Sequence, residues 1–104
     1  MHPLTKRFLD QVAAKNNLLS KSAPRILDEL TKIGVKSKIV GSFARGDITP
    51  ESDLDVLILE YKPLCRGVVL VAAEDAAEPG VDVDVVFAED LSPQGFLRMS
   101  KHEY

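Results

Sequence analysis

The segment Gly41–Ile58, with the sequence GSFARGDITPESDLDVLI, determines how the rest of the chain can be arranged. It begins with a glycine and a serine that follow an apolar, extended-looking segment, Val35–Val40. It ends in an apolar run that starts at Leu54, and Asp53 and Asp55 stand two residues apart at the start of that run. Alternate residues of a strand point to the same face, so the two carboxylates should lie side by side.

Two like charges that lie side by side repel each other, and the arrangement costs free energy unless a cation sits between them. Asp53 and Asp55 are therefore candidate ligands of a hard divalent cation, Mg²⁺ or Mn²⁺. The alternative is a solvated strand end whose aspartates have no further role. The Gly-Ser pair upstream favours the metal site.

Gly41 and Ser42 lie where the first strand is expected to give way to a short helix. Glycine lets a backbone come close to an anion, and free N–H groups and a serine hydroxyl can bind phosphate there. Arg45 could add a charge-assisted contact to the same phosphate. It could equally form a bridge to Asp47 or Glu51 that holds the loop.

A phosphate cradle and metal carboxylates on one short unit predict a site for a metal-bound nucleotide. The spacing Gly41-Ser42, ten residues, then Asp53-Leu54-Asp55 resembles the DNA polymerase beta-type nucleotidyltransferase superfamily. The fuller pattern GSFARGD, four residues, SDLD is similar to its minimal nucleotidyltransferase branch, which includes MntA-like antitoxins paired with HEPN-type proteins. The match is specific over Gly41–Ile58 and looser elsewhere.

The resemblance also implies a third carboxylate on a later strand, in a context that Val83-Asp84-Val85-Val86 fits. Asp82 and Asp84 alternate onto one face, so periodicity alone does not choose between them. The Val-Asp-Val-Val context and a place nearer the middle of the strand favour Asp84.

Length and composition set further bounds. The 104 residues predict a single domain spanning 1–104, with 45% hydrophobic and 28% charged residues, as in an ordinary soluble globule. No apolar run approaches a membrane span, and the polar start MHPLTKRF is not a signal peptide. The single cysteine, Cys65, excludes an internal disulfide, fits a reducing cytoplasm and is expected to be buried as a small hydrophobic side chain.

Charge is distributed unevenly along the chain. Residues 1–46 contain nine Lys and Arg against three Asp and Glu, a net charge of +6, and residues 47–104 have a net charge of −9. The basic half could attract a nucleotide or an acidic partner. The alternative is that most of its lysines solvate helix faces. No basic patch is interleaved with aromatic residues, so direct nucleic-acid binding is not indicated.

Two helices are expected before the first strand. Apolar residues recur at Leu4, Phe8 and Val12, which predicts a helix from Pro3 to about Leu19 with its apolar stripe in the core. A second helix is expected over about 23–33, with Ser22 as its N-cap, Pro24 in its first turn and Gly34 after its end. Its buried stripe would be Ile26, Leu27, Leu30 and Ile33.

The remaining elements follow from alternation and capping signals. Val35–Val40 predicts an edge strand, Leu54–Leu59 a central strand, and Val81–Phe87 a third strand. Val68–Val71 has strand propensity, but the resemblance implies a helix over about Leu64–Glu78.

Residues near the two ends of the chain complete the expectations. Ser92-Pro93 signals a final short helix. His2 and His102 are expected to be exposed, and the order Arg98, His102 near the C-terminus is interpreted as a chance likeness to a HEPN ribonuclease motif.

The predicted fold class is α/β (α+β), the nucleotidyltransferase fold: a small mixed sheet packed by helices on one side. The resemblance implies metal-dependent transfer of a nucleoside monophosphate, AMP from ATP, to a hydroxyl. Asp53, Asp55 and Asp84 would be the catalytic and metal-binding residues for two divalent ions, and Gly41, Ser42 and Arg45 would bind the nucleotide. The acceptor could be a HEPN-type partner or a small molecule. A non-catalytic module that binds a partner or nucleotide is the third alternative.

Overall fold

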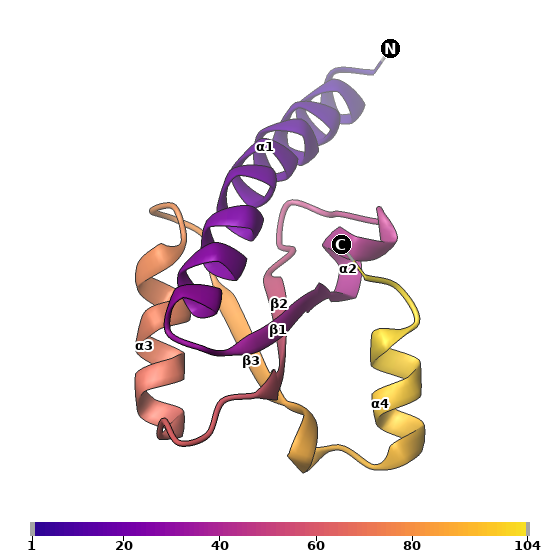
Figure 1. Ribbon diagram of the computed structural model, residues 1–104. Coiled ribbons are helices and arrows are strands. Elements are labelled where there is room, and N and C mark those ends of the chain that lie inside the picture. The colour runs from indigo at the N-terminus through magenta and orange to yellow at the C-terminus, as the bar shows by residue number, and fades with distance from the viewer. Residues whose placement is uncertain (1, 104) are drawn as a thin grey trace.

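The computed structural model describes residues 2–103. A long helix is followed by three strands, with helices between and after them (Figure 1). The elements in chain order are α1 (Pro3–Lys32), β1 (Lys36–Val40), α2 (Gly41–Arg45), β2 (Leu54–Glu60), α3 (Arg66–Ala76), β3 (Val83–Phe87), the 3₁₀ helix η1 (Ala88–Asp90) and α4 (Pro93–Ser100). No helix among the described residues is both long enough and apolar enough to cross a membrane.

The three strands form one mixed sheet in the order β1-β2-β3. β1 runs antiparallel to β2, and β3 runs parallel to β2. The predictions of a central β2 and an edge β1 are confirmed. β2 is central because its apolar residues are buried on both faces, whereas the lysines of β1 need solvent.

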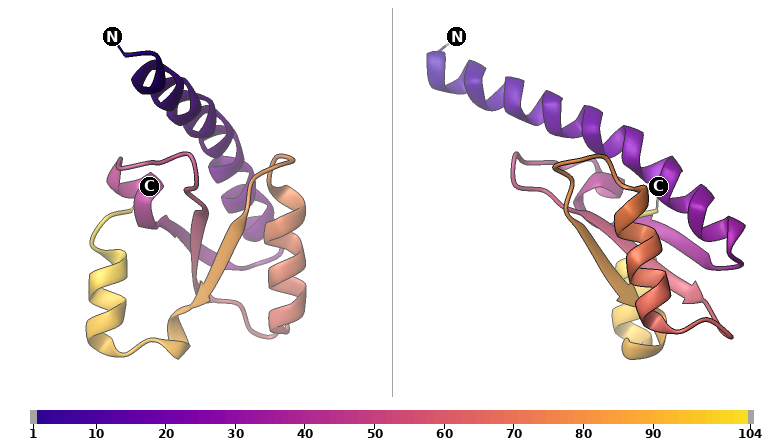
Figure 2. Two further views of the ribbon diagram at one scale, coloured as in Figure 1. Left: turned by 180° about the vertical axis from the view of Figure 1, so that it is seen from behind. Right: turned by 90° about the vertical axis from the view of Figure 1, so that its left-hand side faces the viewer.

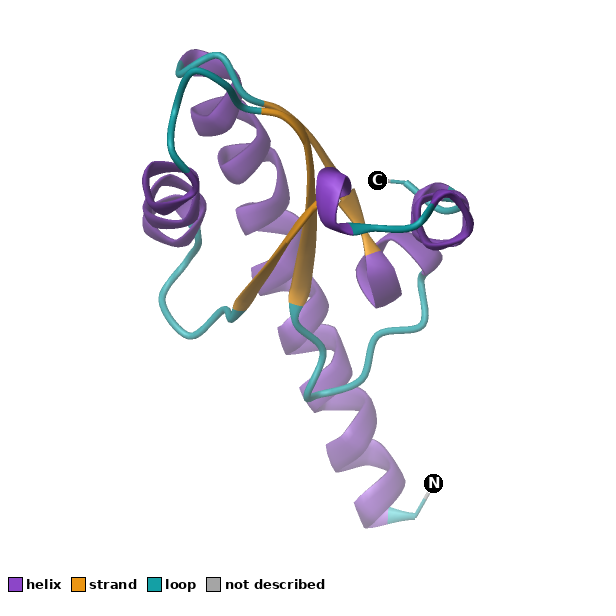
Figure 3. Ribbon diagram, turned by 90° about the horizontal axis from the view of Figure 1, so that it is seen from below, coloured by secondary structure: helices purple, strands orange, loops and turns teal. Residues whose placement is uncertain are grey.

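Helices α1 and α3 cover one face of the sheet, and α4 stands on the other side (Figure 3). The main core lies between the sheet and α1 with α3, where alternate side chains of β2 meet both helices. Its buried members are Leu19, Ala23, Ile26, Leu30, Val35, Ile39, Phe43, Leu54, Val56, Ile58, Val69, Ala73, Ala76 and Phe87. The opposite face of β2 presents Asp55 and Leu57 toward the side of α4.

The expected break between two N-terminal helices is wrong: α1 is continuous, and Pro24 lies inside it. Proline removes one backbone hydrogen bond, but Ala23 and Ile26 beside it are fully buried and hold the helix on the sheet. Ser22 does not cap a helix. It is fully buried, and its hydroxyl accepts a hydrogen bond at 2.9 Å from the backbone N–H of Glu78, which follows α3.

The N-terminal half of α1 projects beyond the rest of the fold (Figure 2). With this helix included, the molecule is 53 Å in its longest dimension. Leu4, Phe8 and Leu9 are 65%, 49% and 47% exposed. The prediction that this stripe is core is therefore wrong, because the sheet ends before the helix does. Ile33, expected in the buried stripe of the second helix, is also exposed.

The later elements largely follow the sequence pattern. The helix expected over Leu64–Glu78 is confirmed as the shorter α3, and the final helix α4 is capped by Ser92, whose hydroxyl accepts a hydrogen bond from the N–H of Gly95. The prediction of a buried Cys65 is wrong. Cys65 is exposed because it precedes the first turn of α3, outside the face that meets the sheet.

Arg66 ties the start of α3 to the segment that leads into α4. Its guanidinium donates two hydrogen bonds to Asp90, at 2.7 and 2.8 Å, and lies 4.4 Å from the ring centre of Phe87. A bidentate arginine–carboxylate pair fixes orientation as well as distance. Tyr61, hydrogen-bonded to Glu89, supports the same corner. The direction in which α4 leaves the sheet is thus anchored at η1.

Candidate functional site

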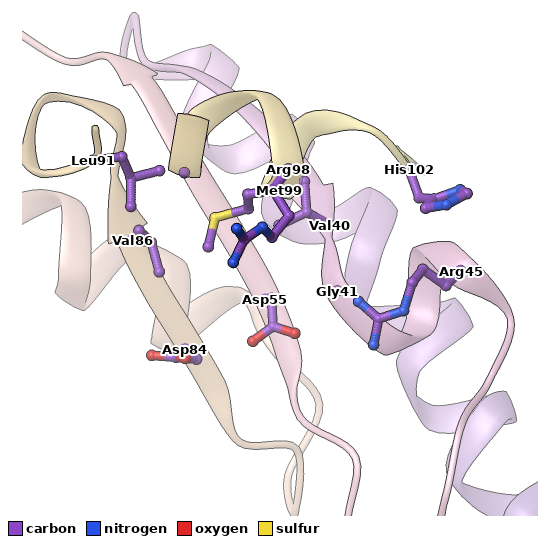
Figure 4. Close-up of a pocket in the computed structure, with 11 residues that line it drawn as sticks. Val40, Gly41, Arg45, Asp55, Asp84, Val86, Leu91, Arg98, Met99 and His102 are labelled. Carbon is purple, nitrogen blue, oxygen red and sulfur yellow. The ribbon is translucent and has the colours of Figure 1, made fainter. Parts of the chain in front are cut away.

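The site lies on the sheet face away from α1 and α3, where three chain segments meet. Asp55 on β2 is paired in register with Val40 at the end of β1 and with Asp84 on β3. The parallel pairing of β2 and β3 therefore brings together two carboxylates that are far apart in sequence. Asp55 and Asp84 both line a cavity of about 410 Å³, and their positions on the two strands are shown in Figure 4.

Gly41 packs directly against Asp55. Its φ is +79°, a conformation that side chains of L-residues rarely adopt. A Cβ placed on Gly41 would lie 1.8 Å from Oδ2 of Asp55, far inside contact distance. Glycine is therefore required here on two grounds, and the backbone at the start of α2 comes as close to the carboxylate as the chain allows.

Asp55 is the one described carboxyl group whose pKa is raised, to about 6. Partial burial is the largest cause, because desolvation disfavours the charged form. The negative charges of Asp84 and Asp53 raise the pKa further, and the positive charge of Arg45 opposes them. The negative charges of three carboxylates therefore repel one another, and a bound cation would reduce that repulsion.

Asp53 and Asp84 are exposed, unlike the half-buried Asp55. Asp53 lies one residue before β2 and is not among the residues that line the cavity. Within residues 2–103, no three Asp, Glu, His or Cys side chains lie close enough together to form a ready-made metal site. The donors nevertheless fit a hard divalent cation: carboxylate oxygens, mutually repelling, at the edge of a cavity.

Asp82 lies outside the strand that carries Asp84. β3 begins at Val83, and Asp82 contributes its backbone carbonyl, which accepts a hydrogen bond at 3.0 Å from the N–H of Leu54. The side chain of Asp82 is not among those that line the cavity.

The predicted short helix after Gly41 is confirmed as α2, and a serine pair holds the loop that follows it. The hydroxyl of Ser42 donates to Oγ of Ser52 at 3.2 Å, and Ser52 also accepts the N–H of Thr49 at 2.8 Å. Ser52 therefore folds the 47–53 loop back over α2, a role that its place beside Asp53 did not reveal.

Arg45 lines the cavity, but its guanidinium is already paired with Asp47. Nε lies 3.3 Å from Oδ2 of Asp47, and both side chains are about half exposed. Of the two alternatives for Arg45, the bridge to Asp47 is the one that the structure contains. The phosphate contact would require this exposed pair to loosen, and pairs of this kind contribute little to stability.

The second wall of the cavity was not predicted from the sequence. It is formed by α4 and the residues around it, which lie opposite Asp55 in Figure 4. The contributing residues are Leu91, Gly95, Arg98, Met99 and His102. His102 is exposed as expected, yet it lies at the rim of the cavity. The spacing 95, 98, 99, 102 is that of one helix face and was the available signal.

A family model described as a nucleotidyltransferase domain matches residues 20–103 of the chain. The fold is similar to that of a solved structure described as a candidate minimal nucleotidyltransferase, with a TM-score of 0.68 and 24% identity over 86% of this chain and 93% of that chain. A candidate nucleotidyltransferase from Sulfolobus solfataricus is similar at a TM-score of 0.48 and 22% identity, over 77% of this chain and 76% of that one. No curated protein matches the chain significantly.

Proposed function

The chain belongs to the nucleotidyltransferase domain family, and on that premise we propose that it transfers AMP from ATP to a hydroxyl group of another molecule. The observation that carries the proposal is the in-register pair of Asp55 and Asp84, which lines a cavity next to the side-chain-free backbone of Gly41. The carboxylates can bind divalent cations, and the side-chain-free backbone of the glycine beside them can approach phosphate groups. The site therefore suits a nucleotide with bound cations.

In the proposed reaction the oxygen of the acceptor hydroxyl forms a bond to the α-phosphorus of ATP. The bond from that phosphorus to the bridging oxygen of the β-phosphate breaks, pyrophosphate leaves, and the hydroxyl proton passes to solvent. The acceptor must approach in line with the leaving oxygen, so catalysis depends mostly on alignment and charge neutralisation.

Asp53, Asp55 and Asp84 would supply the oxygen ligands for two Mg²⁺ or Mn²⁺ ions. Bound ions of this kind neutralise phosphate charge and lower the pKa of an acceptor hydroxyl. With a pKa of about 6, Asp55 is mostly ionised above neutral pH and able to serve as a ligand. Gly41 would admit the β- and γ-phosphates, and Ser42 would turn its hydroxyl from Ser52 to them.

The experiment is calorimetric titration with ATP in the presence of Mg²⁺. The variant Asp53→Asn/Asp55→Asn removes two charges from the site, and we expect its affinity for ATP to fall at least tenfold with the fold retained. The matched control is Glu74→Gln/Asp75→Asn, which removes two exposed carboxylates from α3, on the other side of the sheet. Equal ATP binding by the wild type and the site variant would refute the proposal.

We further propose that the acceptor is a HEPN-type helical protein and that this chain acts as its antitoxin. The projecting half of α1, with Leu4, Phe8 and Leu9 exposed, supports a protein partner because such a stripe normally packs against something. AMP on a tyrosine hydroxyl near an RNA-binding surface would add bulk and negative charge, which repels RNA.

A labelling experiment tests this partner. The protein is incubated with labelled ATP, Mg²⁺ and the product of any adjacent HEPN-like gene. Label on that product, lost with Asp53→Asn/Asp55→Asn, is the expected result. Absence of both label and a complex in size-exclusion chromatography would contradict the partner and favour a small-molecule acceptor. ATP binding without any pyrophosphate release would favour a non-catalytic module.

A further inference from the structure

The cavity has two walls of opposite character. One wall is the sheet, with the carboxylates of Asp55 and Asp84, and the other is α4, which contributes Arg98. In Figure 4 the side chain of Arg98 points from α4 toward the sheet and toward Asp55. A cation therefore faces the carboxylates across a space large enough for a small ligand.

Arg98 differs from the other arginine of the cavity in having no partner among the described residues. Arg45 is paired with Asp47, whereas Arg98 forms no ion pair or hydrogen bond within residues 2–103. Arginine presents five donors in a planar fork that fits phosphate, and an unpaired one beside a ligand cavity has its full charge available. Its geometry therefore suits an anion that enters the cavity.

The surroundings of Arg98 indicate which kind of anion it would bind. A triphosphate and the carboxylates of the sheet wall together would carry more negative charge than two divalent cations neutralise. A cation on the opposite wall offsets that charge from the other side. Val86, Leu91 and Met99 add apolar surface to the same cavity, which would suit the nucleoside part of the ligand.

We propose that Arg98 binds a phosphate group of the nucleoside triphosphate, so that α4 forms the anion-binding wall of the site. This inference rests on the proposed nucleotidyl transfer and adds a residue to it. The proposal also accounts for the three residues that this face of α4 contributes. Gly95 leaves room for the ligand, Arg98 binds phosphate, and Met99 packs against the nucleoside.

The test uses two probes, ATP and inorganic tripolyphosphate, the second of which has no base or sugar. Arg98→Ala should weaken the binding of both, in Mg²⁺, by roughly tenfold to a hundredfold, the effect of losing a charged hydrogen bond. Arg98→Lys keeps the charge without the fork and should retain part of the affinity. Lys101→Ala is the matched control, because Lys101 is an exposed cation just beyond α4 that does not line the cavity.

The outcomes separate this inference from the proposed function. Wild-type affinity for both probes in Arg98→Ala would overturn the role of Arg98 while leaving nucleotidyl transfer in place. A loss for ATP but not for tripolyphosphate would also overturn it, because the contact would then be to the nucleoside. If the wild-type protein bound neither probe, both the inference and the proposed function would be wrong. Thermal unfolding should be unchanged, since Arg98 has no partner in the described chain.

Discussion

Asp55 on β2 and Asp84 on β3 lie directly opposite each other in a parallel strand pair, so that two carboxylates occupy neighbouring positions on one face of the sheet. The negative charge of Asp84 contributes to the raised pKa of Asp55. A chain selected for stability alone would place an apolar residue at one of these positions. The pairing therefore marks a place where stability conflicts with the proposed function.

Asp84 and Asp82 should differ sharply in importance. Asp84 lines the cavity opposite Asp55, whereas Asp82 serves the sheet through its backbone carbonyl, which an Asp82→Asn change leaves intact. We expect Asp84→Asn to reduce transfer on the order of 100-fold, as loss of a charge that stabilises the transition state does, and Asp82→Asn to keep most of the activity. Pyrophosphate release measures both, and the reverse ranking would overturn the assignment of Asp84.

The raised pKa of Asp55 makes stability depend on pH in a defined direction. In the unfolded chain this carboxyl has a pKa of about 3.8, and in the folded protein the pKa is about 6, so the folded state holds the proton more tightly. The free energy of unfolding should therefore fall as pH rises from about 4 through about 6. Urea unfolding of the wild type and of Asp55→Asn across this range measures the effect.

Asp55→Asn removes the titrating group and should show a flatter profile, with higher stability than the wild type at neutral pH. Addition of Mg²⁺ or Mn²⁺ should make the wild-type decline smaller, because a bound cation favours the ionised carboxyl and brings its folded-state pKa back toward the unfolded value. Parallel pH profiles for the two proteins without metal would mean that Asp55 is not the source of the pH-dependent stability.

Gly41 and Gly46 form a natural pair of test and control. Both have positive φ, +79° and +85°, but only a Cβ on Gly41 would collide with Asp55. Gly46→Ala should cost about 1–2 kcal/mol from backbone strain alone. Gly41→Ala should cost more and should displace the Asp55 side chain, so that metal-dependent ATP binding is lost. Chemical denaturation gives the first comparison and calorimetry the second.

Equal effects at the two glycines, on stability and on ATP binding, would show that the contact between Gly41 and Asp55 is not needed. A loss of binding only at Gly41 would place the requirement at that contact.

Ser22 should contribute to stability through one long-range hydrogen bond. Its fully buried hydroxyl accepts the N–H of Glu78, and Ser22→Ala would leave that part-buried donor without its partner. We expect a loss of about 1–3 kcal/mol. Ser20→Ala, at an exposed position of the same helix, should change stability by less than about 0.5 kcal/mol. Thermal or urea unfolding would show the difference, and similar values for the two variants would contradict the role of Ser22.

The central part of the fold could be predicted because its signals are local. The apolar run after Asp53 identifies β2 as the buried strand, and Gly41 after an alternating segment identifies the turn into α2. The in-register meeting of Asp55 and Asp84 could be expected only through the resemblance, since no local pattern gives the pairing of distant strands.

The errors arose where tertiary contacts override local signals. Ser22 and Pro24 have the composition of a helix start, but the partner of Ser22 lies at Glu78, beyond the reach of local reasoning. Leu4 and Phe8 have the periodicity of a buried stripe, which says nothing about whether a surface lies beneath it. In the sequence Arg98 stands out only through a chance likeness to a HEPN motif, and no local pattern shows that its helix face meets the cavity.

The parallel pairing of β2 with β3 also affects the order in which the molecule assembles. β1 and β2 are antiparallel and joined by α2 and a short loop, so they can pair early, whereas β3 reaches β2 only after α3 has crossed the sheet. Contacts between distant segments form late, because the intervening chain must first be ordered. We therefore expect the pairing of Asp55 with Asp84, and with it the repulsion between the two carboxylates, to arise late in folding.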